Sequence, residues 1–215
     1  RELLREWLAA LEMDVQVDQV GNMVAIRPGQ EELQPVLLGS HLDTVSSGGR
    51  FDGAAGVLAG LEVLRTLEDN KISTHHPLGL VVFTNEEGAR YTTDLMGSQA
   101  FNGTLTVEQV WSIRGTDGSL VGEELDRIGY KGEMKCGTMH PYTYLELHVE
   151  QGPQLESLGI PIGVVEAITG ITWLEVTVNG SANHAGTTPM DCRRDAGLAA
   201  ARMAAHLPEL ASGIP

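Results

Sequence analysis

Two patterns of apolar residues alternate along the chain, one periodic and one a short uninterrupted run. Some segments repeat apolar residues every three or four positions, as in a helix with one buried face, and short apolar runs are typical of strands buried on both faces. Strands alternating with helices predict an α/β fold, with a mixed, largely parallel sheet sandwiched by helices. Helices are expected at 1–13, 54–67, 106–113, 119–128 and 193–207, and strands at 15–17, 23–26, 36–39, 78–84 and 142–149.

The pattern changes near residue 168. Residues 171–178 alternate as in a half-buried strand, Asn179-Gly180 is a strong hairpin-turn dipeptide, and an Ala-rich helix follows. This is an α+β style, so we expect a metal-binding domain at 1–168 and the start of a smaller domain at 169–215. The second domain has too few strands to close a core, and we expect both domains to be incomplete. The chain also opens inside a helical pattern without Met, so residues are expected before Arg1.

Composition narrows the class of protein. Apolar residues make up 42% and charged residues 20%, as in ordinary globular proteins. The net charge of -15 disfavours nucleic acid and anionic membranes as partners. No apolar run approaches the length of about 18 residues that a membrane helix needs, and the charged start is unlike a signal peptide. With only Cys136 and Cys192, a disulfide framework is not expected, and a cytoplasmic location is the default.

Polar residues with metal-binding chemistry follow three of the predicted strands. His41 follows one, Glu86-Glu87 follow another, and His148 lies near the end of a third, while Asp52 lies in a Gly-rich loop. Sites in open α/β sheets form beyond the carboxyl ends of strands, and imidazole with carboxylate suits Zn²⁺ or a similar metal. Each residue alone also fits a structural role, since such residues are common in turns. Repetition at three strand ends favours a metal site, and both interpretations stay open at this point.

Five ordered motifs together resemble one family. They are Gly39-Ser-His-Leu-Asp-Thr-Val, Gly48-Gly-Arg-Phe-Asp-Gly, Phe83-Thr-Asn-Glu-Glu-Gly-Ala-Arg, Glu146-Leu-His-Val-Glu-Gln-Gly-Pro and Ala182-Asn-His-Ala-Gly-Thr-Thr-Pro-Met. The chain is similar to the amidase/hydantoinase/carbamoylase branch of the dinuclear zinc metallopeptidase superfamily, which includes N-carbamoyl-L-amino acid hydrolases, β-ureidopropionases and allantoate amidohydrolases. Thr74-His-His-Pro and Met96-Gly-Ser are closer to the carbamoylases.

The resemblance implies a zinc-exopeptidase-like catalytic domain holding two divalent ions, Zn²⁺ first, with Mn²⁺, Co²⁺ or Ni²⁺ as alternatives. Asp52 would bridge the ions through a carboxylate aimed by a cis peptide to Gly53. Asp43 would orient the His41 ring, and Glu86 would be the general base. The implied terminal ligands are His41, Glu87 and His148.

The resemblance also implies substrate contacts by Gln151 and His184, with Asn183 as a companion. His184 lies in the second domain, which would serve as a lid and as the contact of a homodimer. The implied reaction is hydrolysis of the ureido C–N bond of an N-carbamoyl-L-amino acid, or a related ureide, by a water bridging both metals. A further metal-binding His would lie beyond Pro215.

Three other functions stay open. Allantoate could be the substrate, which side-by-side turnover would decide. A dinuclear dipeptidase or aminopeptidase would hydrolyse a dipeptide faster than an N-carbamoyl amino acid. A non-catalytic binding or dimerisation fragment would hold no metal, although the full set of motif residues argues against decay of the site.

Overall fold

The computed structural model describes residues 1–172 and 174–212, which divide into two compact units. Unit 1 runs from Arg1 to Pro161, and unit 2 begins at Ile162. The change of sequence pattern near residue 168 lies within unit 2, and a boundary between folding domains at that point stays a prediction. None of the helices in the described ranges is long and apolar enough to cross a membrane.

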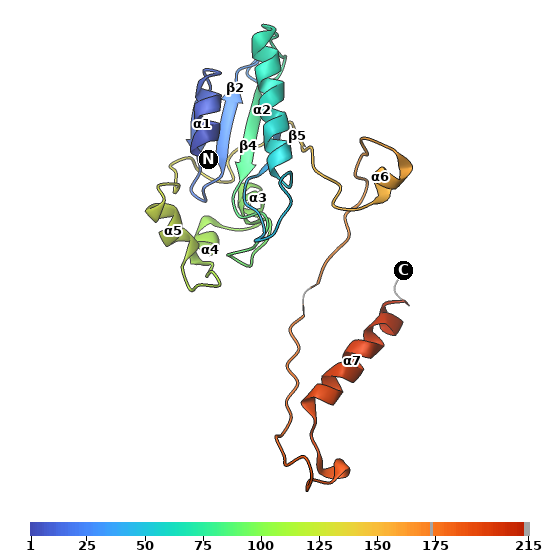
Figure 1. The fold of residues 1–215 in the computed structure, drawn as a ribbon. Coiled ribbons are helices and arrows are strands. Elements are labelled where there is room, and N and C mark those ends of the chain that lie inside the picture. Colours follow the sequence, from blue (N-terminus) through green and yellow to red (C-terminus); the bar gives the residue numbers. More distant parts are fainter. Residues whose placement is uncertain (173, 213–215) are drawn as a thin grey trace. The chain divides into compact units, whose positions relative to one another are not determined.

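Unit 1 is built on a five-stranded mixed sheet (Figure 1). The strand order is β1-β2-β4-β3-β5, with β3, β4 and β5 parallel and the β1–β2 and β2–β4 pairs antiparallel. The predicted mixed α/β sheet is therefore confirmed, and its parallel part comprises three strands. The strands are β1 (Val15–Val17), β2 (Met23–Arg27), β3 (Val36–His41), β4 (Leu78–Phe83) and β5 (Thr143–Leu145).

Helices α1 (Glu2–Ala9) and α2 (Ala54–Asp69) lie together beside the sheet (Figure 1). Their buried leucines, among them Leu8 and Leu64, join one core cluster with Leu80 of β4. Gly60 lets α2 approach closely, since a Cβ there would lie 2.6 Å from Leu80 Cδ1. A smaller cluster contains Val24, Leu37, Val81 and Phe101.

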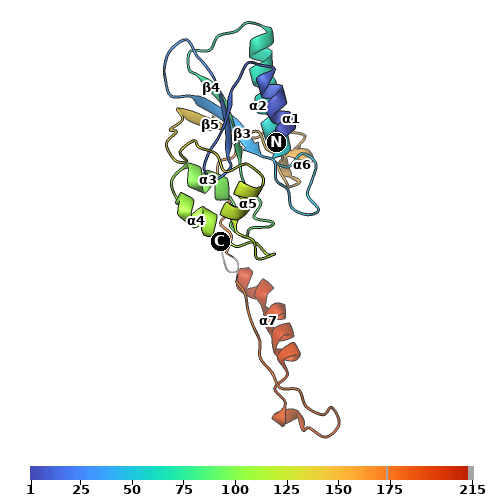
Figure 2. The same cartoon turned by 90° about the vertical axis from the view of Figure 1, so that its left-hand side faces the viewer.

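The remaining helices of unit 1 are short. Helices α3 (Met96–Phe101), α4 (Val107–Ser112) and α5 (Val121–Arg127) gather at one end of the sheet, where β4 finishes (Figure 2). Helix α6 (Gln154–Leu158) follows β5 in the sequence. The sequence predicted α4 and α5 but not α3 or α6, which are each too short to show helical periodicity.

Two predicted strands differ from the structure. The strand expected at 142–149 is formed only over Thr143–Leu145, where β5 pairs with β3. The strand expected at 171–178 is not formed over residues 171–172 and 174–178, and Trp173 lies outside the described residues. A strand needs a neighbour for its backbone hydrogen bonds, and no described residue of unit 2 is in a strand. Unit 2 contains a 3₁₀ turn, η1 (Met190–Cys192), and helix α7 (Ala196–Ala211).

Candidate metal centre

The ends of the parallel strands bring the candidate ligands to one edge of the sheet. His41 is the last residue of β3 and pairs in register with Phe83, the last residue of β4. The segment 84–87 therefore leaves the sheet beside His41. Residues 146–151 leave β5 on the other side of β3, and the loop containing Asp52 leads into α2.

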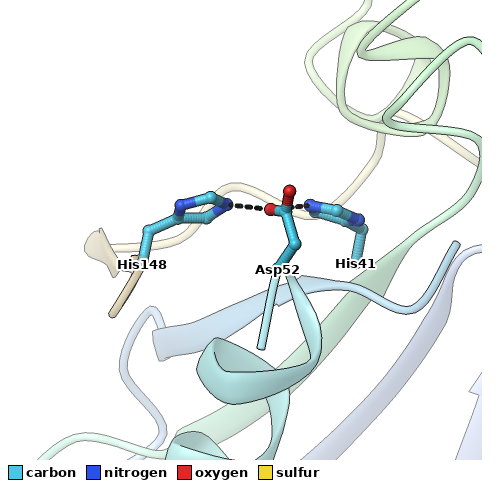
Figure 3. A group of neighbouring side chains, drawn as sticks. All are labelled: His41, Asp52 and His148. Atoms are coloured by element: carbon cyan, nitrogen blue, oxygen red, sulfur yellow. Dashed lines mark ion pairs between the residues drawn. The ribbon is translucent and has the colours of Figure 1, made fainter. Parts of the chain in front are cut away.

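Three of the predicted ligands converge. His148 Nε2 lies 3.2 Å from Asp52 Oδ1, and His41 Nε2 lies 3.9 Å from the same oxygen. All three ligand atoms lie within 4.8 Å of one another. Figure 3 shows the two imidazole rings facing the Asp52 carboxylate from opposite sides. The arrangement has the size and the nitrogen and oxygen donors of a first-row metal site.

The hydrogen bond made by Nδ1 of each ring sets its tautomer, and therefore whether the nitrogen facing Asp52 carries a hydrogen or a lone pair. His41 Nδ1 lies 2.9 Å from the carbonyl oxygen of Asp43, and His148 Nδ1 lies 2.9 Å from the carbonyl oxygen of Val149. A carbonyl oxygen only accepts, so each Nδ1 carries the hydrogen, and in the neutral ring Nε2 is left with a lone pair. The Nε2 atoms of His41 and His148, each with a lone pair free to bind a metal, thus point at Asp52 Oδ1.

Asp52 Oδ1 is buried and has no hydrogen-bond partner. A buried acceptor without a donor is costly, and three converging lone pairs repel one another unless a cation lies among them. The residues present therefore fit a divalent metal ion. The other oxygen, Oδ2, accepts a hydrogen bond of 2.8 Å from Gln151 Nε2.

The backbone after Asp52 differs from the prediction. Every peptide bond in the described residues is trans, so the expected cis bond between Asp52 and Gly53 is wrong. Gly53 instead has a φ of 60°, which glycine adopts without the penalty of a side chain. A Cβ at Gly53 would lie 2.4 Å from His41 Cε1. The chain turns into α2 through this glycine, directly against the imidazole.

Glu86, the predicted base, lies beside this group. Its Oε2 is 3.4 Å from His41 Nε2. Burial raises the pKa of Glu86, the neighbouring His41 lowers it, and the carboxylates of Glu87, Asp43 and Glu146 raise it further. A carboxylate whose pKa lies above its ordinary value is a stronger base and accepts a proton from water more readily.

Glu87 lies outside the group of three, and Asp43 connects it to His41. The Glu87 backbone N–H donates to Asp43 Oδ2 at 3.0 Å, while the Asp43 backbone carbonyl accepts from His41. The contact expected between Asp43 and the His41 ring is thus made by the backbone carbonyl, since the carboxylate Oδ1 is 3.8 Å from His41 Nδ1. Glu87 Oε1 is buried without a hydrogen-bond partner, as is Asp43 Oδ1.

Glu146 and Ser40 form a contact that the sequence did not predict. Ser40 Oγ donates to Glu146 Oε1, and the Tyr144 hydroxyl donates to Oε2 at 2.8 Å. The β3–β5 ladder stops at Leu145, so this carboxylate continues the attachment to β3 toward His148. Ser40 and Glu146 were detectable as the residues one and two positions before the two histidines.

The remaining predicted site residues, Asn183 and His184, lie in unit 2. His184 Nδ1 accepts hydrogen bonds from the backbone N–H groups of Gly186 at 3.1 Å and Thr187 at 3.2 Å. Its hydrogen therefore sits on Nε2 in the neutral ring, as a donor. Asn183 Nδ2 donates to the Ser181 carbonyl oxygen at 3.3 Å.

Curated relatives resemble the chain over nearly all of its length. It is 44% identical over 204 residues to the N-carbamoyl-L-amino-acid amidohydrolase of Rhizobium meliloti, covering 94% of this chain and 49% of that protein. It is 35% identical over 210 residues to the allantoate deiminase of Arabidopsis thaliana, covering 94% of this chain and 40% of that protein. The chain thus spans about half the length, or less, of these relatives.

A solved structure shares the fold and much of the sequence. A crystal structure of an amidase of the hydantoinase/carbamoylase family from Burkholderia vietnamiensis matches with a TM-score of 0.84 and 39% identity. The match covers 100% of this chain and 52% of that one. The resemblance inferred from the five motifs is thereby confirmed. The profile of peptidase family M20/M25/M40 matches residues 37–211, a range that holds each of the converging ligands, and the chain belongs to this family.

Proposed function

We propose that the protein carrying this chain is a metal-dependent amidohydrolase that cleaves the ureido C–N bond of N-carbamoyl-L-amino acids. One observation carries the proposal: two imidazole lone pairs converge on the unpartnered Oδ1 of Asp52, with Glu86 beside them. The substrate class follows from the names of relatives such as the Rhizobium meliloti enzyme. A covalent route through Ser or Cys finds no support in the motifs.

His41, Asp52 and His148 would hold one divalent ion. Glu87, with its buried and unpartnered Oε1, is the carboxylate we assign to a second ion, with Asp52 shared between the two. The nitrogen and oxygen donors suit Zn²⁺, and Mn²⁺, Co²⁺ and Ni²⁺ are the alternatives. Bound ions would supply Lewis acidity, which polarises the ureido carbonyl and makes water more acidic.

Glu86 would move the proton. Its carboxylate accepts a proton from water as the water oxygen bonds to the ureido carbon, and it passes that proton to the departing nitrogen as the C–N bond breaks. Ammonia leaves, and the remaining carbamate breaks down to carbon dioxide and the amino acid. The raised pKa of Glu86 makes its carboxylate a stronger base for the first half of this transfer.

We assign substrate contacts to Gln151, Asn183 and His184. The Nε2–H of His184 is the donor that would stabilise negative charge on the carbonyl oxygen, because its Nδ1 is occupied by two backbone N–H groups. We propose a homodimer formed through the second domain, in which His184 serves the site of the partner. Two free cysteines, Cys136 and Cys192, fit a cytoplasmic enzyme.

Turnover of a substrate panel tests the proposal. The protein is treated with a chelator, reloaded with Zn²⁺, Mn²⁺ or Co²⁺, and given N-carbamoyl-L-amino acids, allantoate and a dipeptide. N-carbamoyl-L-amino acid hydrolysis that disappears with the chelator and returns with metal is expected. If allantoate or the dipeptide were hydrolysed faster than the N-carbamoyl-L-amino acids, the proposed substrate class would be wrong. Absence of both bound metal and turnover would favour a non-catalytic binding or dimerisation role.

A further inference from the structure

The segment that follows β4 is a loop whose two ends are joined by backbone hydrogen bonds. The backbone N–H of Gly97 donates to the carbonyl oxygen of Thr84 at 2.9 Å, and the N–H of Leu95 donates to the carbonyl oxygen of Glu86 at 2.7 Å. Residues 84–97 thus form a loop with paired ends, called here the 84–97 loop. It presents Glu86 and Glu87, so its internal order sets where both carboxylates lie.

The base of the 84–97 loop is held by a buried amide from β1–β2. Asn22 Oδ1 accepts from the Thr84 N–H at 2.9 Å, and Asn22 Nδ2 donates to the Gly97 carbonyl oxygen at 3.0 Å. The same Nδ2 donates to Asp18 Oδ2 at 2.8 Å, and both residues are fully buried. With the base fixed, the remaining freedom of the loop lies in its interior.

Asn85 occupies that interior. Its φ is 52°, a left-handed conformation that few residues other than glycine and asparagine adopt readily. Its Nδ2 donates to the carbonyl oxygens of Tyr91 at 3.0 Å and Thr93 at 2.9 Å, so both hydrogens of the amide are used within the loop. The backbone turn and the side-chain bonds act at the residue immediately before Glu86.

We propose that Asn85 is a positioning residue that fixes Glu86 and Glu87 for the reaction. The left-handed turn at Asn85 leads into the position where the Glu86 carbonyl meets the Leu95 N–H. From there Glu86 lies 3.4 Å from His41 Nε2, and the Glu87 N–H reaches Asp43 at 3.0 Å. The role in catalysis rests on the proposed function, whereas the ordering of the loop does not.

Two substitutions separate the amide from the backbone turn. Asn85→Gly keeps the left-handed conformation and removes the amide, and Asn85→Asp keeps the shape but cannot donate to the two carbonyl oxygens. Asn70→Asp is the matched control. Asn70 is exposed at the end of α2 and donates its Nδ2 to the Thr66 carbonyl oxygen at 2.8 Å, so its variant loses a similar bond and gains the same charge away from the site.

Hydrogen exchange by mass spectrometry and steady-state kinetics test the proposal. Both Asn85 variants should exchange the backbone hydrogens of 86–97 about tenfold faster, with residues 78–83 unchanged. They should lower kcat for N-carbamoyl-L-amino acids by about 10–100-fold and leave KM within about twofold, because misplaced groups act on the chemical step. The Co²⁺ ion assigned to His41, Asp52 and His148 should stay bound as in the parent chain, since these residues lie outside the loop, whereas binding of the second Co²⁺ ion, assigned to Glu87, should weaken.

Unchanged exchange over 86–97 in the Asn85→Gly variant would overturn the proposal. Faster exchange with an unaltered kcat would also overturn it, since loop order would then be irrelevant to the carboxylates. If the parent protein hydrolyses none of the substrates, the proposed function fails. In that case unchanged exchange over 86–97 in the Asn85→Gly variant still overturns the positioning role. Faster exchange in this variant, with a Co²⁺ absorption spectrum that differs from that of the parent protein, supports it.

Discussion

Replacing Gly53 by Ala should damage both stability and metal binding. The φ of 60° with a ψ of -50° is not a region that L-residues occupy readily. The new Cβ would also lie 2.4 Å from His41 Cε1 and 2.5 Å from His41 Nδ1. The imidazole is only 2% exposed, so it has little room to move away.

The structure sets the magnitude of both effects. A residue held in a sparsely populated backbone conformation costs about 1–3 kcal/mol of folding free energy. For a chain of this size that cost corresponds to a fall in Tm of about 2–12 °C. If the ring yields instead, His41 Nε2 leaves its place near Asp52, and metal affinity should fall about 10–100-fold, as for the loss of a group that orients a ligand.

Gly49→Ala is the matched control. Gly49 lies in the same loop, and an added Cβ there would meet no atom within 4 Å. Thermal unfolding of the metal-free protein and titration with Co²⁺ would be measured for both variants. Gly53→Ala with the Tm and the Co²⁺ affinity of Gly49→Ala would refute the reasoning, because neither the turn nor the contact with His41 would then matter.

Three further predictions follow from the site and the core. Glu86→Gln should lower turnover by about 10²–10⁴ while metal content stays intact, whereas Asp52→Ala should lose metal; the reverse pattern in metal analysis and kinetics would contradict the assigned roles. Leu64→Ala, fully buried in α2, should reduce the free energy of unfolding by about 2–5 kcal/mol in urea titrations, against about 0.5 kcal/mol or less for the half-exposed Leu58→Ala on the same helix. Burial raises the pKa of Asp18 above its ordinary value, so the protonated form is favoured in the fold and its stabilisation is lost as pH rises from about 4. Stability relative to Asp18→Asn should accordingly decrease as pH rises above about 4, and a difference independent of pH would contradict this expectation.

The sequence predicted the parts of the fold that carry a local signal. The apolar runs at β3 and β4 and the periodic helix α2 are present in the structure, as is the meeting of strand ends that brings His41 and His148 to Asp52. These follow from hydrophobic periodicity and from the geometry of parallel strands, both of which are readable without coordinates.

What the sequence missed depends on contacts between distant residues. The bond from Asn22 to Thr84 joins residues 62 positions apart, and the bond from Ser40 to Glu146 joins residues 106 positions apart. Asp43 was expected to orient the His41 ring; its backbone carbonyl oxygen contacts the ring, and its carboxylate accepts from the Glu87 N–H. Whether the backbone carbonyl or the carboxylate of one residue makes a contact is decided by the folded backbone, not by spacing.

The early end of the β3–β5 ladder has a consequence for ion uptake. Beyond Leu145, the segment carrying His148 is held to β3 by side-chain bonds such as that from Ser40 to Glu146, which open more readily than a continuous ladder. The measured affinity is the intrinsic affinity multiplied by the fraction of molecules in which this segment is closed. Each 1.4 kcal/mol spent on closing the segment therefore weakens the apparent Kd about tenfold. A bound ion would in turn stabilise the closed segment, because it binds only that state. Metal content and protection of this segment from hydrogen exchange should therefore rise together.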